Sequence, residues 1–370
     1  MTHTPEPHHP GDDELAPVVA PPPVFHAEQA LLGALLRDPH RLGDVTGIGP
    51  ASFSTAAHAA VWAAITALPA PDPAAHAKDT TWHTAVLAAA REHARGLTPT
   101  YLHTLIQHCS WPSHAPAYAR MVEADHSRRR LKSAAGQLLR TVRDTALPHR
   151  VQTTLAEAHA LTAVVDDIAI RFPPRAGVRP PPAVDPALLP LDAEAVEEER
   201  LLLATATARP DTIAALPWLL PDDFVLPLHA GLWQTLSLLA RRQGPADPVT
   251  VLWEAQQRGV LDDRTPPRDV LELLSETSGA ADYWAERVLE RSLLATADRT
   301  AQRIAAYASA PATTPFQLVV GARRALADLG TARTRWQHAT STAPPPRPRP
   351  ATAARAGPPT TAVRPARATR

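Results

Sequence analysis

Two glutamates and two histidines of the chain stand at matching positions. Glu28 and Glu199 are separated by 171 residues, and His58 and His229 have the same separation. Glutamate and histidine are side chains that enzymes use for general acid–base catalysis, so the repeat invites an active-site interpretation. Structural positions in two copies of one fold would show the same repetition. We favour that structural interpretation and predict no catalytic residue.

The other acids and histidines form no recognisable site. Two adjacent aspartate pairs, at residues 166–167 and 222–223, lie beside expected helix ends or turns, where acids commonly act as caps. The histidines between residues 81 and 109 form neither an HExxH motif nor a Cys/His ligand set. The sequence therefore predicts neither a metal site nor a cofactor.

The chain also lacks a phosphate loop. Nucleotide-hydrolysing motor domains carry the pattern GxxxxGK[ST], in which the lysine reaches the β- and γ-phosphates. Lys78 and Lys132 are the only lysines of the chain, and neither follows a glycine. We therefore predict that this chain does not hydrolyse ATP and is not an enzyme.

One basic run is a candidate for contact with nucleic acid or with an acidic partner. It consists of Arg128, Arg129, Arg130 and Lys132, on an expected long helix. Because successive helical residues are turned by about 100°, the run does not form one face. The alternative is an ordinary solvated helix. The second copy reads SLLATA at the corresponding place, so any such role belongs to the first unit alone.

A second group of basic residues lies near the C-terminus. This stretch has many prolines, no acid and no apolar periodicity, so we expect a disordered basic tail. It could hold a phosphate backbone through counterion release, without sequence preference. The alternative is a low-complexity end with no ligand, and the net charge of the whole chain, zero, does not itself indicate nucleic-acid binding. The arginines concerned are Arg347, Arg349, Arg355, Arg364, Arg367 and Arg370.

The elements that carry these residues are duplicated. The stretch from residue 25 to 68 recurs near residue 200, which implies two copies of one fold. In the first copy, a predicted helix carries Glu28 in its first turn, at the positive helix end, and a leucine stripe follows. A second predicted helix carries Trp62, Ile65 and Leu68 on one face. Pairs with the same separation include Leu31/Leu202, Pro39/Pro210, Phe53/Phe224 and Trp62/Trp233.

A long helical hairpin is predicted after each copy. In the first unit, a helix begins near Ala115, breaks at Pro148 and returns over about residues 151–168. In the second unit, the hairpin breaks at Pro311. We expect the protein to self-associate through these hairpins.

The motifs of both units resemble the N-terminal domain of the DnaB family of bacterial replicative DNA helicases. In the first unit they are AEQALLGALL, a turn that begins with proline, a phenylalanine and the pattern H..VW..I. The second unit keeps PDDF, the histidine and the tryptophan, and continues with GPADPVTVLWEAQQRGVLDD. YARMV and YWAERVLERSLL resemble the opening of the family's hairpin. The resemblance implies an all-α protein in which two tandem helical-bundle heads are each followed by a two-helix hairpin.

Composition is consistent with this division. One cysteine, Cys109, suits a reducing compartment, and no apolar run approaches the ~20 residues of a membrane span, so we expect a cytoplasmic protein without membrane contact. The 41 prolines cluster at the ends and in the middle of the chain. The expected parts are a disordered acidic tail (1–23), unit 1 (24–170), a proline-rich linker (171–191), unit 2 (192–337) and a disordered basic tail (338–370).

In the DnaB family this domain associates into the helicase collar and meets primase. The resemblance therefore implies a non-catalytic assembly or adaptor role in DNA replication, with a replicative helicase or primase as partner. Two alternatives remain: a DNA-binding accessory protein that acts through its basic tail, and a regulatory subunit of a separately encoded helicase motor. Because the family's domains pair, we expect that the duplication builds that pair within one chain.

Overall fold

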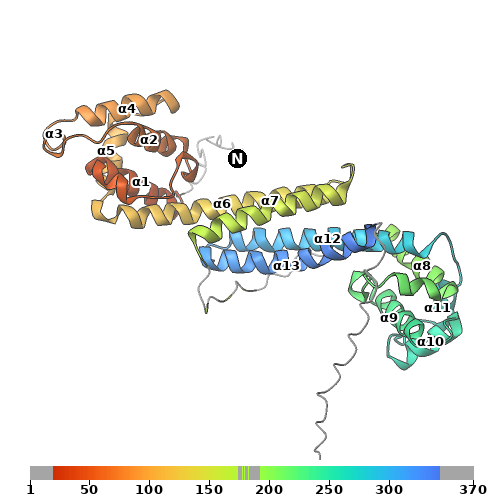
Figure 1. Ribbon diagram of the computed structural model, residues 1–370. Helices are drawn as coiled ribbons and strands as arrows, with labels where there is room; N and C mark the ends of the chain where they lie inside the picture. The colour runs from red at the N-terminus through yellow and green to blue at the C-terminus, as the bar shows by residue number, and fades with distance from the viewer. Residues whose placement is uncertain (1–19, 174–176, 178, 180–181, 183–191, 342–370) are drawn as a thin grey trace, which may run out of the picture.

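The computed structural model describes residues 20–173, 177, 179, 182 and 192–341. Over these residues the chain is helical and contains no strand, which confirms the all-α prediction. Figure 1 shows two small heads at opposite ends of a bundle of long helices. The predicted disordered ends lie almost entirely outside the described residues, as does most of the predicted linker.

The first head is built from short helices that begin at prolines or at capping threonines. Thr55 accepts a hydrogen bond from the His58 backbone N–H at 3.2 Å, and Thr98 accepts one from the Tyr101 N–H at 3.1 Å. The helices are α1 (Pro23–Arg37), α2 (Ala56–Ala67), α3 (Pro73–His76), α4 (Thr81–His93) and α5 (Pro99–His108), with the 3-10 turns η1 (Pro39–Asp44), η2 (Pro50–Ser52) and η3 (Pro112–His114).

The second head repeats the same core with a different set of outer helices. Trp62 and Trp233 are both buried, and each contacts the phenylalanine of its own unit, with ring centroids 5.5 and 5.8 Å apart. Leu68 differs from the prediction, because it is the C-cap residue of α2 and is only partly buried. The elements of this head are α8 (Ala193–Ala208), η4 (Pro210–Ala215), η5 (Pro221–Asp223), α9 (Pro227–Arg241), α10 (Pro248–Gln257) and α11 (Pro267–Leu273).

Two helical hairpins follow the heads, as predicted. Pro148 and Pro311 both lie in the hairpin turns, because proline cannot continue a helix that needs its N–H. Residues 338–340 belong to the last helix, so the predicted start of the tail at residue 338 is too early. The hairpin helices are α6 (Ala115–Arg143), α7 (Arg150–Arg171), α12 (Ala281–Ser309) and α13 (Pro315–Thr340).

The two hairpins pack together into one four-helix bundle (Figure 1). Leu131 of α6, Leu161 of α7, Leu293 of α12 and Leu318 of α13 lie in a single apolar cluster. The structure therefore pairs the two units within one chain, as expected from the duplication.

The first helix of each hairpin is shared between a head and the bundle. Ala115, Ala119 and Val122 of α6 belong to the core of the first head, whereas residues from Leu131 onward belong to the bundle core. The division of α12 is equivalent: its first turns join the second head, and residues from Leu293 onward join the bundle. A continuous helix thus connects each head firmly to the bundle. Among the described residues, no helix combines the length and the apolarity that crossing a membrane requires.

Candidate assembly interface

The repeated glutamate and histidine form a buried pair in each head. In the first head, the Glu28 carboxylate lies 2.6 Å from His58 Nδ1 and accepts hydrogen bonds from the Ser54 backbone N–H (2.7 Å) and hydroxyl (2.9 Å). Both side chains of this pair are fully buried. The prediction that Glu28 lies in the first turn of its helix is wrong, because α1 begins at Pro23. The positive helix end that Glu28 faces is that of α2, whose N-cap follows Ser54.

The second head contains the same arrangement. His229 Nδ1 lies 2.8 Å from the Glu199 carboxylate, which also accepts the Val225 backbone N–H at the start of α9. Both side chains are buried. A buried carboxylate is stable only when hydrogen bonds replace its water, and each pair supplies them while fixing one helix to the start of another. These contacts support the structural interpretation of the repeat.

The structure separates the four residues of the predicted basic run. Arg129 donates to Asp125 at 2.8 Å and to the Ser52 carbonyl at 2.7 Å, and Arg130 pairs with Asp167. Lys132 is exposed. The run does not form one face, as the helical period predicts, and its role in nucleic-acid binding stays a prediction. The predicted tail arginines lie outside the described residues.

Arg128 reaches the other unit. Its guanidinium donates to the carbonyls of Ala310 (2.6 Å) and Thr313 (2.6 Å), and at longer range to those of Ala308 (3.4 Å) and Pro311 (3.3 Å). These carbonyls end α12 and form the turn into α13, where the helix itself offers no donors. An arginine of the first hairpin thus caps a helix of the second.

Two further ion pairs join the hairpins. Arg143 of α6 donates to Asp298 of α12 at 2.7 Å, and the Asp298 carboxylate is 1% exposed. The hydrogen bond to Asp298 raises the pKa of Arg143. Arg323 of α13 donates to Asp166 of α7 at 2.8 Å, but both side chains are about half exposed, so this pair contributes little. The buried end of the first pair makes it the principal polar contact of the interface.

An arginine near the end of each hairpin holds the adjacent head. Arg171 pairs with Glu123 and donates to the Gly47 carbonyl at 3.4 Å. Arg335 pairs with the buried Asp223 and donates to the Trp218 carbonyl at 3.3 Å. Gly47 and Trp218 are again 171 residues apart. Sequence patterns did not identify these arginines, because a backbone carbonyl acceptor leaves no trace in the sequence.

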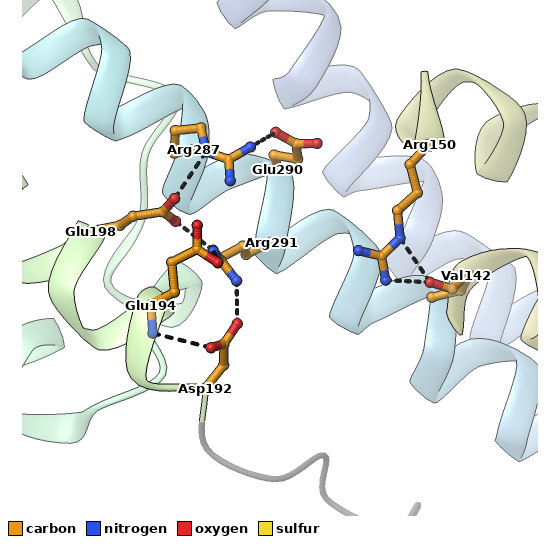
Figure 2. Close-up of polar contacts among 8 residues, drawn as sticks. All are labelled: Val142, Arg150, Asp192, Glu194, Glu198, Arg287, Glu290 and Arg291. Carbon is orange, nitrogen blue, oxygen red and sulfur yellow. Dashed lines mark hydrogen bonds and ion pairs between the residues drawn. The ribbon is translucent and has the colours of Figure 1, made fainter. Parts of the chain in front are cut away.

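A cluster of arginines and acids is specific to the second unit (Figure 2). Arg287 donates to Glu198 at 2.9 Å and to Glu290 at 2.8 Å, and Arg291 pairs with Glu198 and with Asp192. Partial burial lowers the pKa of Arg291, but its hydrogen bonds to the acids outweigh this and raise that pKa above its ordinary value. The cluster fixes the start of α8 to α12.

Figure 2 also shows a cap within the first hairpin. Arg150, at the start of α7, donates through Nε to the Val142 carbonyl at 3.0 Å. Val142 lies in the last turn of α6, where a carbonyl has no partner in its own helix. Arginine side chains therefore cap the ends of both α6 and α12.

Comparison with protein-family models matched the DnaB-like helicase N terminal domain at residues 20–124 and again at residues 192–290. The two matches cover more than half of the chain. The chain belongs to the DnaB-like helicase N-terminal domain family. Each DnaB-like match spans a head and the first part of α6 or α12, and no motor-domain family matched. No curated protein and no solved structure matched the chain.

Proposed function

We propose that this chain is a non-catalytic assembly or adaptor protein of DNA replication that binds a replicative helicase or a primase through its heads. Membership of the DnaB-like N-terminal domain family supports a helicase-related role. The observation that carries the adaptor role is the internal bundle. Because the hairpins bury each other's apolar faces, these faces are not available to a partner, whereas the two heads stand free at opposite ends of the molecule (Figure 1).

The second head offers a surface of the kind that protein partners use. Val249 and Trp253 lie one turn apart on α10 and are 65% and 62% exposed. Exposed aromatic residues are enriched at the energetically important centres of protein interfaces. This part of α10 is therefore our candidate contact with the partner.

Several observations support a non-catalytic role in the cytoplasm. The Glu28–His58 and Glu199–His229 pairs are buried and bonded within the heads, and neither lysine belongs to a phosphate loop. The single cysteine, Cys109, is buried and unpaired, which suits a reducing compartment.

A binding experiment with purified components tests the proposal. The chain without its tail (residues 1–341) is immobilised and offered the replicative helicase and the primase of its own organism, separately. We expect one of them to be retained, and retention to fall when Trp253 is replaced by alanine. Retention of neither protein by a folded sample contradicts the proposal.

A DNA-binding accessory role is the second candidate, favoured by the six arginines and the lack of acids from residue 347 to 370. Binding of this kind weakens steeply as salt rises from about 50 to 200 mM, because counterions are released. We expect the full chain to bind DNA in this way and residues 1–341 to bind much less. If both bind equally, the tail is not the DNA contact. A regulatory subunit of a separate motor would instead change the ATPase rate of the helicase that it retains.

A further inference from the structure

We propose that the two hairpins are built to pair with each other and not with copies of themselves. The basis is a comparison of α6 with α12, which are both 29 residues long. Their buried residues coincide when the helices are aligned from end to end, as for Ala119 with Ala285 and Leu138 with Ile304. The alignment therefore shows which residue would replace each contact residue if two copies of the same hairpin paired in this geometry.

Three pairings are possible: first hairpin with second, first with first, and second with second. The Arg143–Asp298 pair forms only in the first of these. In this alignment, Asp298 of α12 corresponds to Lys132 of α6, and Arg143 of α6 corresponds to Ser309 of α12. The observed pairing of unlike hairpins places Arg143 on Asp298, with the donor 2.7 Å from the carboxylate.

Pairing of like hairpins removes this contact and adds a cost. Two copies of the first hairpin in the same geometry would place Arg143 opposite Lys132, at two symmetric positions. Two copies of the second would place Ser309 opposite Asp298, which leaves a buried carboxylate without its cation. Repulsion between like charges and an unpaired buried charge both disfavour an association, and such features give interfaces their specificity.

The cap supplied by Arg128 reinforces the same preference. Arg128 belongs to α6. The aligned residue of α12 is Leu294, which lies in the apolar bundle core. In a pair of two second hairpins, the Ala310 and Thr313 carbonyls would therefore face leucine instead of a guanidinium. Thr313 is buried, and a buried carbonyl that loses its donor costs free energy. The second hairpin thus requires a partner with a cation at the position of Arg128.

The chain consequently forms a closed pair whose hairpins do not accept a like hairpin from a second copy. The preference belongs to the hairpins and does not depend on which partner the heads bind. Conversely, any foreign hairpin that displaces the second one from the first should carry an acid at the position equivalent to Asp298.

Cutting the linker of the intact protein tests the proposal. A protease site is introduced within residues 183–189, the folded chain is cleaved, and the two halves, one of them tagged, are incubated together. Native mass spectrometry then counts pairs of unlike and like halves. We expect unlike pairs to exceed like pairs by about tenfold or more, because juxtaposed like charges cost several kcal/mol. Equal amounts of unlike and like pairs, or halves that separate, overturn the proposal.

The variant Lys132→Glu tests the charge basis directly. Lys132 is exposed, so the substitution should leave the fold intact, yet it would place a carboxylate against Arg143 in a pair of two first halves. We expect such pairs to rise by about tenfold relative to the parent chain. Ser133→Glu is the matched control, because it adds an acid at the next exposed position, about 100° around the helix. No rise with Lys132→Glu, or an equal rise with both variants, overturns the charge basis.

Discussion

Arg143 of the first hairpin and Asp298 of the second form an ion pair that is open to water at one end and closed at the other. The Arg143 side chain is 49% exposed, whereas the Asp298 side chain is 1% exposed. Loss of the arginine therefore leaves a buried carboxylate, while loss of the aspartate leaves an arginine that water can solvate. We expect Arg143→Ala to lower the free energy of unfolding by about 1–3 kcal/mol.

Thermal and urea unfolding of purified variants measure this effect. Arg140→Ala is the matched control, because Arg140 lies one turn earlier, is exposed and bonds only Gln137 of its own helix among the described contacts. An Arg143→Ala variant no less stable than the Arg140→Ala variant would show that the ion pair does not hold the hairpins together.

Arg128→Ala separates a structural role from a nucleic-acid role. Because Arg128 caps the α12 end through the Ala310 and Thr313 carbonyls, we expect a loss of about 1–3 kcal/mol in the free energy of unfolding. Lys132→Ala, from the same basic run, should be close to neutral because Lys132 is exposed. If Arg128→Ala instead reduces DNA binding and leaves the unfolding curve unchanged, the run contacts nucleic acid and the cap is unimportant.

Local patterns in the sequence were enough to predict the helices and the duplication. The Trp62 and Trp233 core, the hairpin breaks at Pro148 and Pro311 and the all-α class all depend on residues close together in the chain. A helical period indicates where a helix lies, and a proline indicates where it begins or ends.

Polar contacts between distant residues could not be predicted in the same way. The sequence presents Arg128 as a member of a basic run, but its acceptors are carbonyls about 180 residues later, and a carbonyl has no sequence signature. The helical pattern predicts that Glu28 lies at the positive end of its own helix, whereas it faces the start of α2. The sequence shows that a charge needs a partner, but the tertiary fold decides which one.

His126 should make stability depend on pH. Burial first, and then the charges of Arg129, Arg130 and Arg171, lower the pKa of His126 from its ordinary value of 6.5. Asp125 acts weakly in the opposite direction. Below pH 6.5 the unfolded chain then binds a proton that the folded chain does not, so stability falls as the pH falls from 6.5 towards the lowered value.

We therefore expect His126→Gln to reduce the loss of stability between pH 7 and pH 5, measured by the midpoint of thermal unfolding. His159→Gln is the control, because His159 lies on the adjacent hairpin helix and is exposed. An unchanged pH profile in the His126 variant would mean that its pKa is not lowered in the folded protein.

Trp253→Ala should weaken partner binding without destabilising the head. The side chain is 62% exposed, so its removal opens no cavity in the core, whereas truncation of an aromatic anchor at an interface typically costs about 2 kcal/mol or more of binding free energy. Tyr283→Ala, which removes another exposed aromatic residue of the second unit, serves as the comparison. Equal affinity of the parent chain and the Trp253 variant for the retained helicase or primase would exclude α10 as the contact.

The central claim is that the hairpins pair within one chain and that the heads bind a replication protein. Light scattering coupled to size-exclusion chromatography tests it most directly, because the measured mass shows whether the chain is a monomer and whether it has bound a partner. Alone, the chain should elute as a single species of 39.7 kDa, since its hairpins are already paired. With the replicative helicase or the primase of its own organism, it should elute at the summed mass of a complex. A dimer of the chain alone would contradict the closed internal pair, and elution apart from both proteins would contradict the adaptor role.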